Sequence, residues 1–156
     1  MARVLLWLFV LNLGLAFGAG MYEGRITLHD WLVSSADGTL HWNAEAAQRH
    51  NSGVRFWVFV TTVPLTLLTV ANLIAAWRTT GALREWWLTA AVFALGDRIF
   101  TFAYFIPVMV GLLHAPDSPE AVKTAVQWAN LNYIRHALVL TAWLAALKAF
   151  SLASSE

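Results

Sequence analysis

The sequence predicts an all-α fold: a four-helix transmembrane bundle with a long polar loop between helices 1 and 2. Of the 156 residues, 59% are hydrophobic and only 12% are charged, whereas soluble domains are typically about 25% charged. Four apolar segments are each long enough to cross a bilayer as a helix, which takes about 20 residues. The longest polar stretch lies between the first two segments, so we expect a single transmembrane domain over residues 1–156.

The predicted spans cover residues 3–21, 54–77, 86–113 and 119–152. The first has a basic start and a small-residue end, as a secretory signal peptide does, and we interpret it as a retained spanning helix. Pro64 and Pro107 lie inside the second and third spans and predict kinks, because proline has no N–H to donate within a helix. Ser118 followed by Pro119 is typical of a helix start and marks the fourth span.

The predicted external loop over residues 22–53 is polar and more acidic than basic. Asp37 and Gly38 are typical of a tight turn, which predicts a small hairpin. Asn43 is a suitable N-cap for a short helix over residues 44–50. Loops of this length usually have a function, and this segment could cover a binding site as a lid.

Charge and composition limit the partners. The positive-inside rule places both termini in the cytoplasm, because one side of the predicted bundle carries the basic residues Arg3, Arg78, Arg84 and Lys148. A net charge of +1 without a basic run gives no indication of nucleic-acid binding, and the absence of cysteine excludes disulfides and thiolate ligands. The lipid bilayer is the predicted partner. Gly14 and Gly18 form a GxxxG pattern that suits either packing inside the bundle or a homo-oligomer.

The third predicted span carries two opposite charges near its middle, Asp97 and Arg98. A charge at mid-membrane costs about 2.5–3.5 kcal/mol, so such groups usually face a protein interior or a wet cavity. The pattern favours a functional pocket at this helix, with neutralisation of the charges for packing alone as the alternative. Adjacent helical residues point about 100° apart, so we expect Asp97 to pair with Arg135 of the fourth span, directly or through water. Arg98 should then reach Asn12, Asn72 or a backbone carbonyl.

Helical spacing places further polar residues on shared faces. One face of the third span holds Asp97, Thr101, Tyr104 and Val108. One face of the fourth span holds Trp128, Asn132, Arg135 and Val139, with His136 at its edge. Near the outer ends of the first two spans, Glu23 and Arg55 are placed to form a rim ion pair, which contributes only about 0–1 kcal/mol when exposed.

The histidines allow two interpretations. Four of them fall on the outer side without the spacing of a metal site, so solvated side chains are favoured over metal ligands: His29, His41, His50 and His114. His136 lies within an apolar helix beside Arg135 and suits either a hydrogen-bonded core histidine or a base. No cofactor is predicted, and a metal or haem held by histidines remains the alternative.

Two motifs follow one another in the third and fourth spans: Tyr-Phe-x-Pro at residues 104–107, and Trp-x3-Asn-x2-Arg at residues 128–135. Shorter matches are Gly-Met-Tyr-Glu at residues 20–23 and Phe-Trp at residues 56–57. With these residues the sequence resembles the small four-helix membrane family that includes the anthrone oxygenases. The resemblance implies a four-helix fold. It also implies a cofactor-independent oxygenase, since the characterised members convert an anthrone to an anthraquinone with molecular oxygen.

The residues are compatible with that chemistry, in which a base makes an electron-rich anion that reduces oxygen. The candidate bases are Glu23, Asp97 and His136. The candidate donors that stabilise an enolate are Tyr104, Asn132 and Arg135. The residues expected to bind the substrate are Arg55, Thr101, Phe105 and Trp128. Each aromatic side chain suits lipid contact as well as a flat substrate.

Three functions therefore compete. The first is a membrane oxidoreductase or oxygenase for a lipophilic aromatic or quinol-type molecule, bound in a pocket within the bundle. The second is a non-enzymatic module, such as a small transporter or an accessory subunit, in which the buried charges form a relay or a packing lock. Four helices without an inverted repeat argue against a transporter acting alone. The third is a haem-binding or metal-binding membrane protein.

Overall fold

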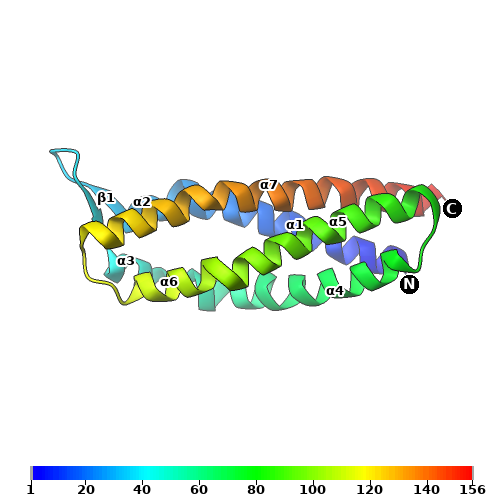
Figure 1. Ribbon diagram of the computed structural model, residues 1–156, viewed down its shortest axis with the longest axis horizontal. Helices are drawn as coiled ribbons and strands as arrows, with labels where there is room; N and C mark the ends of the chain where they lie inside the picture. Colours follow the sequence, from blue (N-terminus) through cyan, green and yellow to red (C-terminus); the bar gives the residue numbers. More distant parts are fainter. Residues whose placement is uncertain (1, 156) are drawn as a thin grey trace.

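Residues 2–155 are described by a computed structural model, in which four long helical stretches run side by side along the molecule (Figure 1). Each is long and apolar enough to cross a membrane: Ala2–Trp31, Gly53–Trp77, Gly81–Leu113 and Pro119–Ser154. The prediction of a helical bundle with four helices able to span a membrane is therefore confirmed, and the four predicted spans lie within these stretches.

Three of the four stretches contain wider, π-helical turns, which are labelled η. The first stretch consists of α1 (Ala2–Tyr22), η1 (Glu23–Thr27) and α2 (Leu28–Trp31). The second consists of η2 (Gly53–Thr62) and α4 (Val63–Trp77). The third consists of α5 (Gly81–Phe100), η3 (Thr101–Phe105) and α6 (Ile106–Leu113). The fourth is α7 (Pro119–Ser155) alone.

Both prolines predicted to disturb a span stand two residues beyond the end of a π-helical segment. Pro64 follows η2 at the start of α4, and Pro107 follows η3 at the start of α6. Proline cannot donate to the carbonyl four residues before it, which must find another donor. For Pro64 this is the carbonyl of Val60, which accepts a 2.7 Å hydrogen bond from Nδ2 of Asn12. The carbonyl that Pro64 leaves without a donor therefore accepts a hydrogen bond that links α1 to η2.

The two ends of the bundle differ. The chain termini and the turn between α4 and α5 lie at one end, called the inner end here (Figure 1). The opposite, outer end carries α2, the hairpin of β1 (Leu32–Ser34) and β2 (Leu40–Trp42), α3 (Ala44–His50) and the connection from α6 to α7. We call residues 28–50 the outer cap.

The long polar loop predicted over residues 22–53 is not what the structure has. The first helical stretch continues past its predicted end at residue 21 as far as Trp31. Trp31 is only 1% exposed and lies 6.3 Å from the ring of Trp128, so its burial favours continued helix despite the polar composition. Most of the remaining segment is regular as well.

The smaller predictions within that segment are confirmed. β1 pairs antiparallel with β2, with Leu32 opposite Trp42. The turn contains Gly38 at a φ of 85°, a conformation that glycine adopts without strain. At the start of α3, Oδ1 of Asn43 accepts a 3.0 Å hydrogen bond from the backbone N–H of Ala46, so Asn43 is the N-cap.

The outer cap is fixed to the connection between α6 and α7. Nε1 of Trp42 donates to the Leu112 carbonyl at 2.9 Å, and its backbone N–H donates to Oδ1 of Asp117 at 2.8 Å. Nδ1 of His41 lies 2.7 Å from the other oxygen of Asp117. These contacts hold the cap against the bundle over the end of α6.

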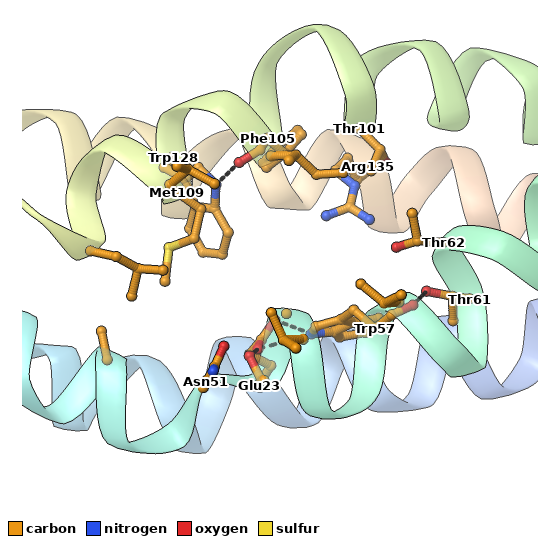
Figure 2. A pocket seen from close by; sticks show the side chains of 18 of the residues that line it. Glu23, Asn51, Trp57, Thr61, Thr62, Thr101, Phe105, Met109, Trp128 and Arg135 are labelled. Carbon is orange, nitrogen blue, oxygen red and sulfur yellow. Dashed lines mark hydrogen bonds between the residues drawn. The ribbon is translucent and has the colours of Figure 1, made fainter.

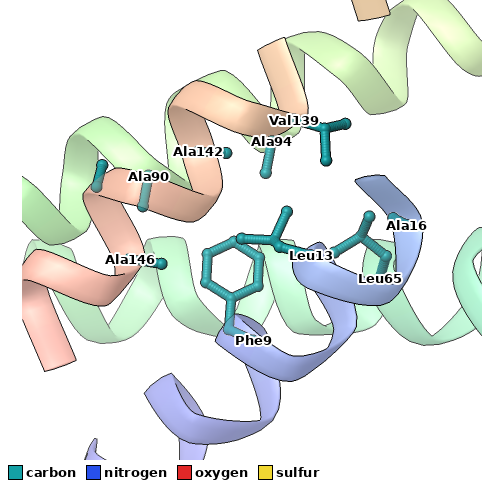
Figure 3. Packing of buried hydrophobic residues seen from close by; sticks show 10 residues of the cluster. Phe9, Leu13, Ala16, Leu65, Ala90, Ala94, Val139, Ala142 and Ala146 are labelled. Carbon is teal, nitrogen blue, oxygen red and sulfur yellow. The ribbon is translucent and has the colours of Figure 1, made fainter. Parts of the chain in front are cut away.

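The inner half of the bundle is packed with small residues. Four alanines of α7 that were expected to form a smooth contact face are all buried: Ala142, Ala145, Ala146 and Ala149. The first three pack with Ala90 and Ala94 of α5 and with Phe9 and Leu13 of α1 (Figure 3). Small side chains let the helices approach closely here.

Candidate functional site

An ion triad joins α5 to α7 near the middle of the bundle. Asp97 is 0% exposed, and its Oδ1 accepts a 3.1 Å hydrogen bond from Nε of Arg135. Its Oδ2 accepts hydrogen bonds from Nε and Nη2 of Arg98, at 3.1 and 2.5 Å. The predicted pair of Asp97 and Arg135 is confirmed. Two guanidinium groups share one carboxylate, so the triad has a positive formal charge.

The partner predicted for Arg98 is wrong. It binds its chain neighbour Asp97 rather than Asn12, Asn72 or a carbonyl. Neighbouring side chains do leave a helix in different directions, but the guanidinium ends a long flexible stem that reaches back. The two asparagines have other contacts: Asn12 binds the Val60 carbonyl, and Asn72 accepts a 2.8 Å hydrogen bond from Nε1 of Trp87.

Beside the triad lies a cavity of about 210 Å³, which we call the main cavity because both arginines of the triad line its largely apolar space. Figure 2 shows Thr101, Phe105, Trp128 and Arg135 on one wall and Glu23, Trp57 and Thr61 on the facing wall. The lining is largely apolar, with charged side chains only at Glu23, Arg98 and Arg135 among the residues described. An apolar cavity with a few convergent polar groups is the usual form of a small-molecule site.

Glu23 is held on its wall by two donors. Nε1 of Trp57 donates to both carboxylate oxygens, at 3.0 and 3.1 Å, and the hydroxyl of Ser52 donates to one of them. The predicted ion pair with Arg55 is wrong, because Arg55 is exposed and forms no ion pair within residues 2–155. The helix of η2 turns Trp57 toward Glu23 and leaves Arg55 pointing outward, away from the cavity.

The face of the third helix differs from the predicted one beyond Thr101. Phe105 and Met109 follow Thr101 along the cavity wall, whereas Tyr104 lines none of the three cavities found. Tyr104 packs against Phe100 and Phe105, with ring centroids 5.7 and 5.2 Å away. The turns of η3 contain more residues than an α-helical turn, so the residue that faces the bundle shifts by one.

Arg135 and Trp128 are both placed by Phe105. The guanidinium carbon of Arg135 lies 4.6 Å from the centre of the Phe105 ring, and Nε1 of Trp128 donates to the Phe105 carbonyl at 3.2 Å. Arg135 also donates from Nη1 to Oδ1 of Asn132 at 3.1 Å. Asn132 does not line the main cavity itself, so it can affect that cavity only by orienting Arg135. Its own side chain lies on the opposite side of Arg135 from the main cavity.

A second pocket of about 290 Å³ lies on that other side, between the first stretch and α7. Asn132 and His136 line it, together with Glu23. Nδ1 of His136 is buried and has no hydrogen-bond partner in the described part of the chain. A Cβ at position 20 would lie only 2.8 Å from Nε2 of His136, so Gly20 is what lets the imidazole pack against α1.

A small polar cavity of about 20 Å³ lies between the main cavity and the second pocket. Glu23 lines all three spaces. The charged and polar groups around the small cavity include Glu23, Arg98, Asn132, Arg135 and His136. The space and its donors suit a single water molecule.

The other four histidines do not converge. His41 contacts Asp117, and Nε2 of His50 lies 3.2 Å from Oδ2 of Asp30, both at the protein surface. Nδ1 of His114 is 2.9 Å from the Val110 carbonyl, within its own helix. Across residues 2–155, no three side chains of His, Cys, Asp or Glu lie close enough together to hold a metal ion.

The structure thus brings together five of the predicted site residues at the main cavity: Glu23, Thr101, Phe105, Trp128 and Arg135. Sequence reasoning missed Arg98, Ser52 and Trp57 as site residues. The sequence did contain a signal for Trp57, because Trp57 and Glu23 both fall near the outer ends of the first two predicted spans. Comparisons of the chain with protein-family models, curated proteins and solved structures find no match.

Proposed function

We propose that this chain is an integral membrane protein that binds a lipophilic aromatic or quinol-type molecule in the main cavity and oxidises it as a cofactor-independent oxygenase. One observation carries the proposal: a tryptophan-lined apolar cavity places a carboxylate opposite two guanidinium groups. A ligand between these walls meets a base on one side and fixed positive charge on the other. The resemblance to the anthrone oxygenases supplies the reaction class.

The rim of the cavity supports entry from the lipid. Between η2 and α6 the lining includes apolar side chains that are also exposed on the outside of the bundle: Val54, Ile106 and Val110. In a membrane these side chains would face hydrocarbon, so a lipophilic substrate could enter sideways. The basic residues near the inner end, including Arg78 and Arg84, favour a topology with both termini in the cytoplasm and the outer cap on the opposite side.

In the proposed reaction a methylene group flanked by aromatic rings becomes a ketone, and molecular oxygen supplies the new oxygen atom. A base removes one methylene proton, and the resulting anion reduces oxygen as a carbon–oxygen bond forms. Return of a proton gives a hydroperoxide. Cleavage of its oxygen–oxygen bond then releases water and leaves the ketone. One oxygen atom enters the product and the other leaves in the water.

Among the three candidate bases, the geometry favours Glu23. Its carboxylate lines the main cavity and makes no ion pair within the part of the chain described. Asp97 is fully buried behind the cavity wall and is already bound by two arginines. His136 lines only the second pocket and the small polar cavity, where it can exchange a proton with Glu23 through water.

The stabilising donors follow from the same geometry. Arg135 lines the cavity and presents its guanidinium toward the wall of Glu23 (Figure 2), so it is placed to hold the negative charge of an enolate. Asn132 orients Arg135 through the 3.1 Å hydrogen bond. Phe105 and Trp128 supply flat apolar surface for the rings of the substrate.

The test is turnover by the purified protein in lipid nanodiscs with anthrone as the probe substrate. We expect oxygen uptake and anthraquinone formation above the rate in empty nanodiscs. Glu23→Gln and Arg135→Ala should abolish the excess, whereas Glu45→Gln, an exposed carboxylate on α3, should retain it. Absence of any excess over empty nanodiscs would contradict the proposal, as would wild-type turnover by Arg135→Ala.

A non-enzymatic membrane module is the second candidate, and one observation favours it. The triad of Asp97, Arg98 and Arg135 ties α5 to α7 and would serve as a packing lock without any catalysis. The closely packed alanines of the inner half argue against a through-path for a transported solute. Binding of anthrone without oxygen uptake would favour this candidate, as a small-molecule-binding accessory protein.

A further inference from the structure

Arg98 has one donor that the ion triad does not use. Its Nε and Nη2 form one edge of the planar guanidinium, and both donate to Asp97. Nη1 lies at the opposite corner, is buried, and has no hydrogen-bond partner in residues 2–155. A buried charged donor without a partner is unfavourable and calls for one. Arg98 lines both the main cavity and the small polar cavity, so its guanidinium lies at their shared wall.

Thr101 supplies a second donor beside it. Its hydroxyl oxygen accepts a long 3.4 Å hydrogen bond from Nη2 of Arg98, which leaves the hydroxyl hydrogen to be donated. On the facing wall, Thr61 donates to the carbonyl four residues before it at 3.2 Å, as helical threonines often do. Within the described chain Thr101 makes no such bond, and it begins η3, where wider turns replace the α-helical pattern.

We propose that Nη1 of Arg98 and the hydroxyl of Thr101 form an anion subsite on the triad wall of the main cavity. The subsite binds one ionised oxygen of a planar lipophilic ligand, so the ligand class is a phenol or enol that binds as its anion. This inference rests on the proposed function for the use of the cavity, and it adds the group that the protein recognises. The excess positive charge of the triad complements that oxygen.

The one carboxylate lining the cavity does not occupy the subsite. Glu23 stands on the facing wall, where Ser52 and Trp57 donate to it, and no ion pair links it to Arg98 in the part of the chain described. A ligand that spans the cavity can therefore place its ionised oxygen at Arg98 and a neutral edge near Glu23. A neutral aromatic hydrocarbon would fill the same space and leave Nη1 unpaired.

Binding of a matched pair of compounds tests the subsite. The probes are lawsone, a hydroxynaphthoquinone that is an anion at neutral pH, and its methyl ether, which has no ionised oxygen. Calorimetric titration into the full chain in nanodiscs, corrected with empty nanodiscs, gives both affinities. We expect Thr101→Val and Arg98→Gln each to weaken lawsone by about 10-fold or more while changing the ether by less than about twofold. Thr62→Val, which removes a hydroxyl from the facing wall, should leave the ratio of the two affinities unchanged.

The outcomes separate this subsite from the proposed function. If the wild type binds lawsone and the ether equally, or if Thr101→Val weakens both alike, Nη1 has only water as its partner and the subsite is wrong. Thr101→Val keeps this result decisive should Arg98→Gln fail to fold, because it leaves the triad intact. Failure of both compounds to bind would contradict the use of the cavity and with it the proposed function. Selective binding of lawsone without oxygen uptake from anthrone would support the subsite alone.

Discussion

The inner and outer halves of this bundle differ in how closely their helices pack. In the inner half, alanines of α5 and α7 meet large side chains of α1, and the helices are regular (Figure 3). The outer half contains the outer cap (Figure 1) and the main cavity (Figure 2). The π-helical segments of the described chain, both disruptive prolines and the other two cavities lie there as well. Regular helices with small residues close the core, and widened turns leave space in it.

The ion triad marks the boundary between the halves. Asp97 is four residues before η3, and Arg135 reaches it from α7. One side of the triad is packed hydrocarbon and the other is the wall of the main cavity. A buried charge cluster is poor at stabilising a fold by itself, because desolvation offsets much of the attraction. Its position at the edge of the cavity is what a binding role requires.

The largest effect is expected at the triad itself. Asp97→Asn should destabilise the protein by about 3–5 kcal/mol, because it leaves the buried guanidinium of Arg98 and the partly buried one of Arg135 without their counter-charge. Thermal unfolding in detergent, followed by circular dichroism, measures the loss. Glu85→Gln, an exposed carboxylate on the same helix, should change stability by less than about 0.5 kcal/mol. Equal stability of the two variants would mean that the triad does not stabilise the contact between α5 and α7.

Added bulk distinguishes the two halves directly. Ala142→Leu in the inner half should cost about 1–3 kcal/mol, because its side chain is 0% exposed among close neighbours. Val58→Phe in the outer half points into the main cavity and should cost less stability while weakening probe binding. Unfolding and lawsone titration on both variants provide the comparison. A larger stability loss for Val58→Phe would show that the cavity is no more open than the inner core.

Two glycines of α1 give a finer comparison. Gly18 has open space where a Cβ would lie, so Gly18→Ala should gain up to about 1 kcal/mol from helix propensity. At Gly20 the added Cβ would lie 2.8 Å from Nε2 of His136, so Gly20→Ala should lose that gain and displace the imidazole. Unfolding measures the difference, and the histidine resonances in an NMR spectrum report the displacement. A stabilised Gly20→Ala with unmoved resonances would contradict the close packing.

The sequence was sufficient for the helices, and insufficient for their irregularities. Hydropathy located the four spans, and helical spacing predicted that Asp97 would meet Arg135. Spacing failed at Tyr104, because an α-helical period cannot anticipate the wider turns of η3. It failed at Arg98 because the direction of a Cβ does not fix where a long side chain ends.

The polar segment after the first span was misjudged for a related reason. Composition predicted a loop over residues 22–53, whereas burial of Trp31 and Trp42 against the α6 and α7 ends gives it structure. The local signals in that segment, the turn at Gly38 and the cap at Asn43, were correct because they act over a few residues. Contacts between distant segments are the part that one sequence does not reveal.

Attachment of the outer cap should depend on pH through Asp117. Hydrogen bonds from His41 and from the backbone N–H of Trp42 lower the pKa of Asp117 below its usual value. A lowered pKa means that the ionised form stabilises the docked cap: the effect is complete above the usual pKa, near 4, and is lost as the pH falls through the lowered one. Acid should therefore release the cap, seen as faster hydrogen exchange over β2.

A matched substitution decides whether this carboxylate is responsible. Asp117→Asn should already exchange faster over β2 at neutral pH and should respond less to acid. Asp37 also has a lowered pKa, chiefly from the backbone N–H of Thr39, but it lies in the hairpin turn and forms no ion pair with α6 or α7 in the described part of the chain. Asp37→Asn should therefore leave the acid release unchanged. If both variants respond to acid as the wild type does, the cap is held by its tryptophans alone, and the outer half is less dependent on surface polar contacts than its geometry indicates.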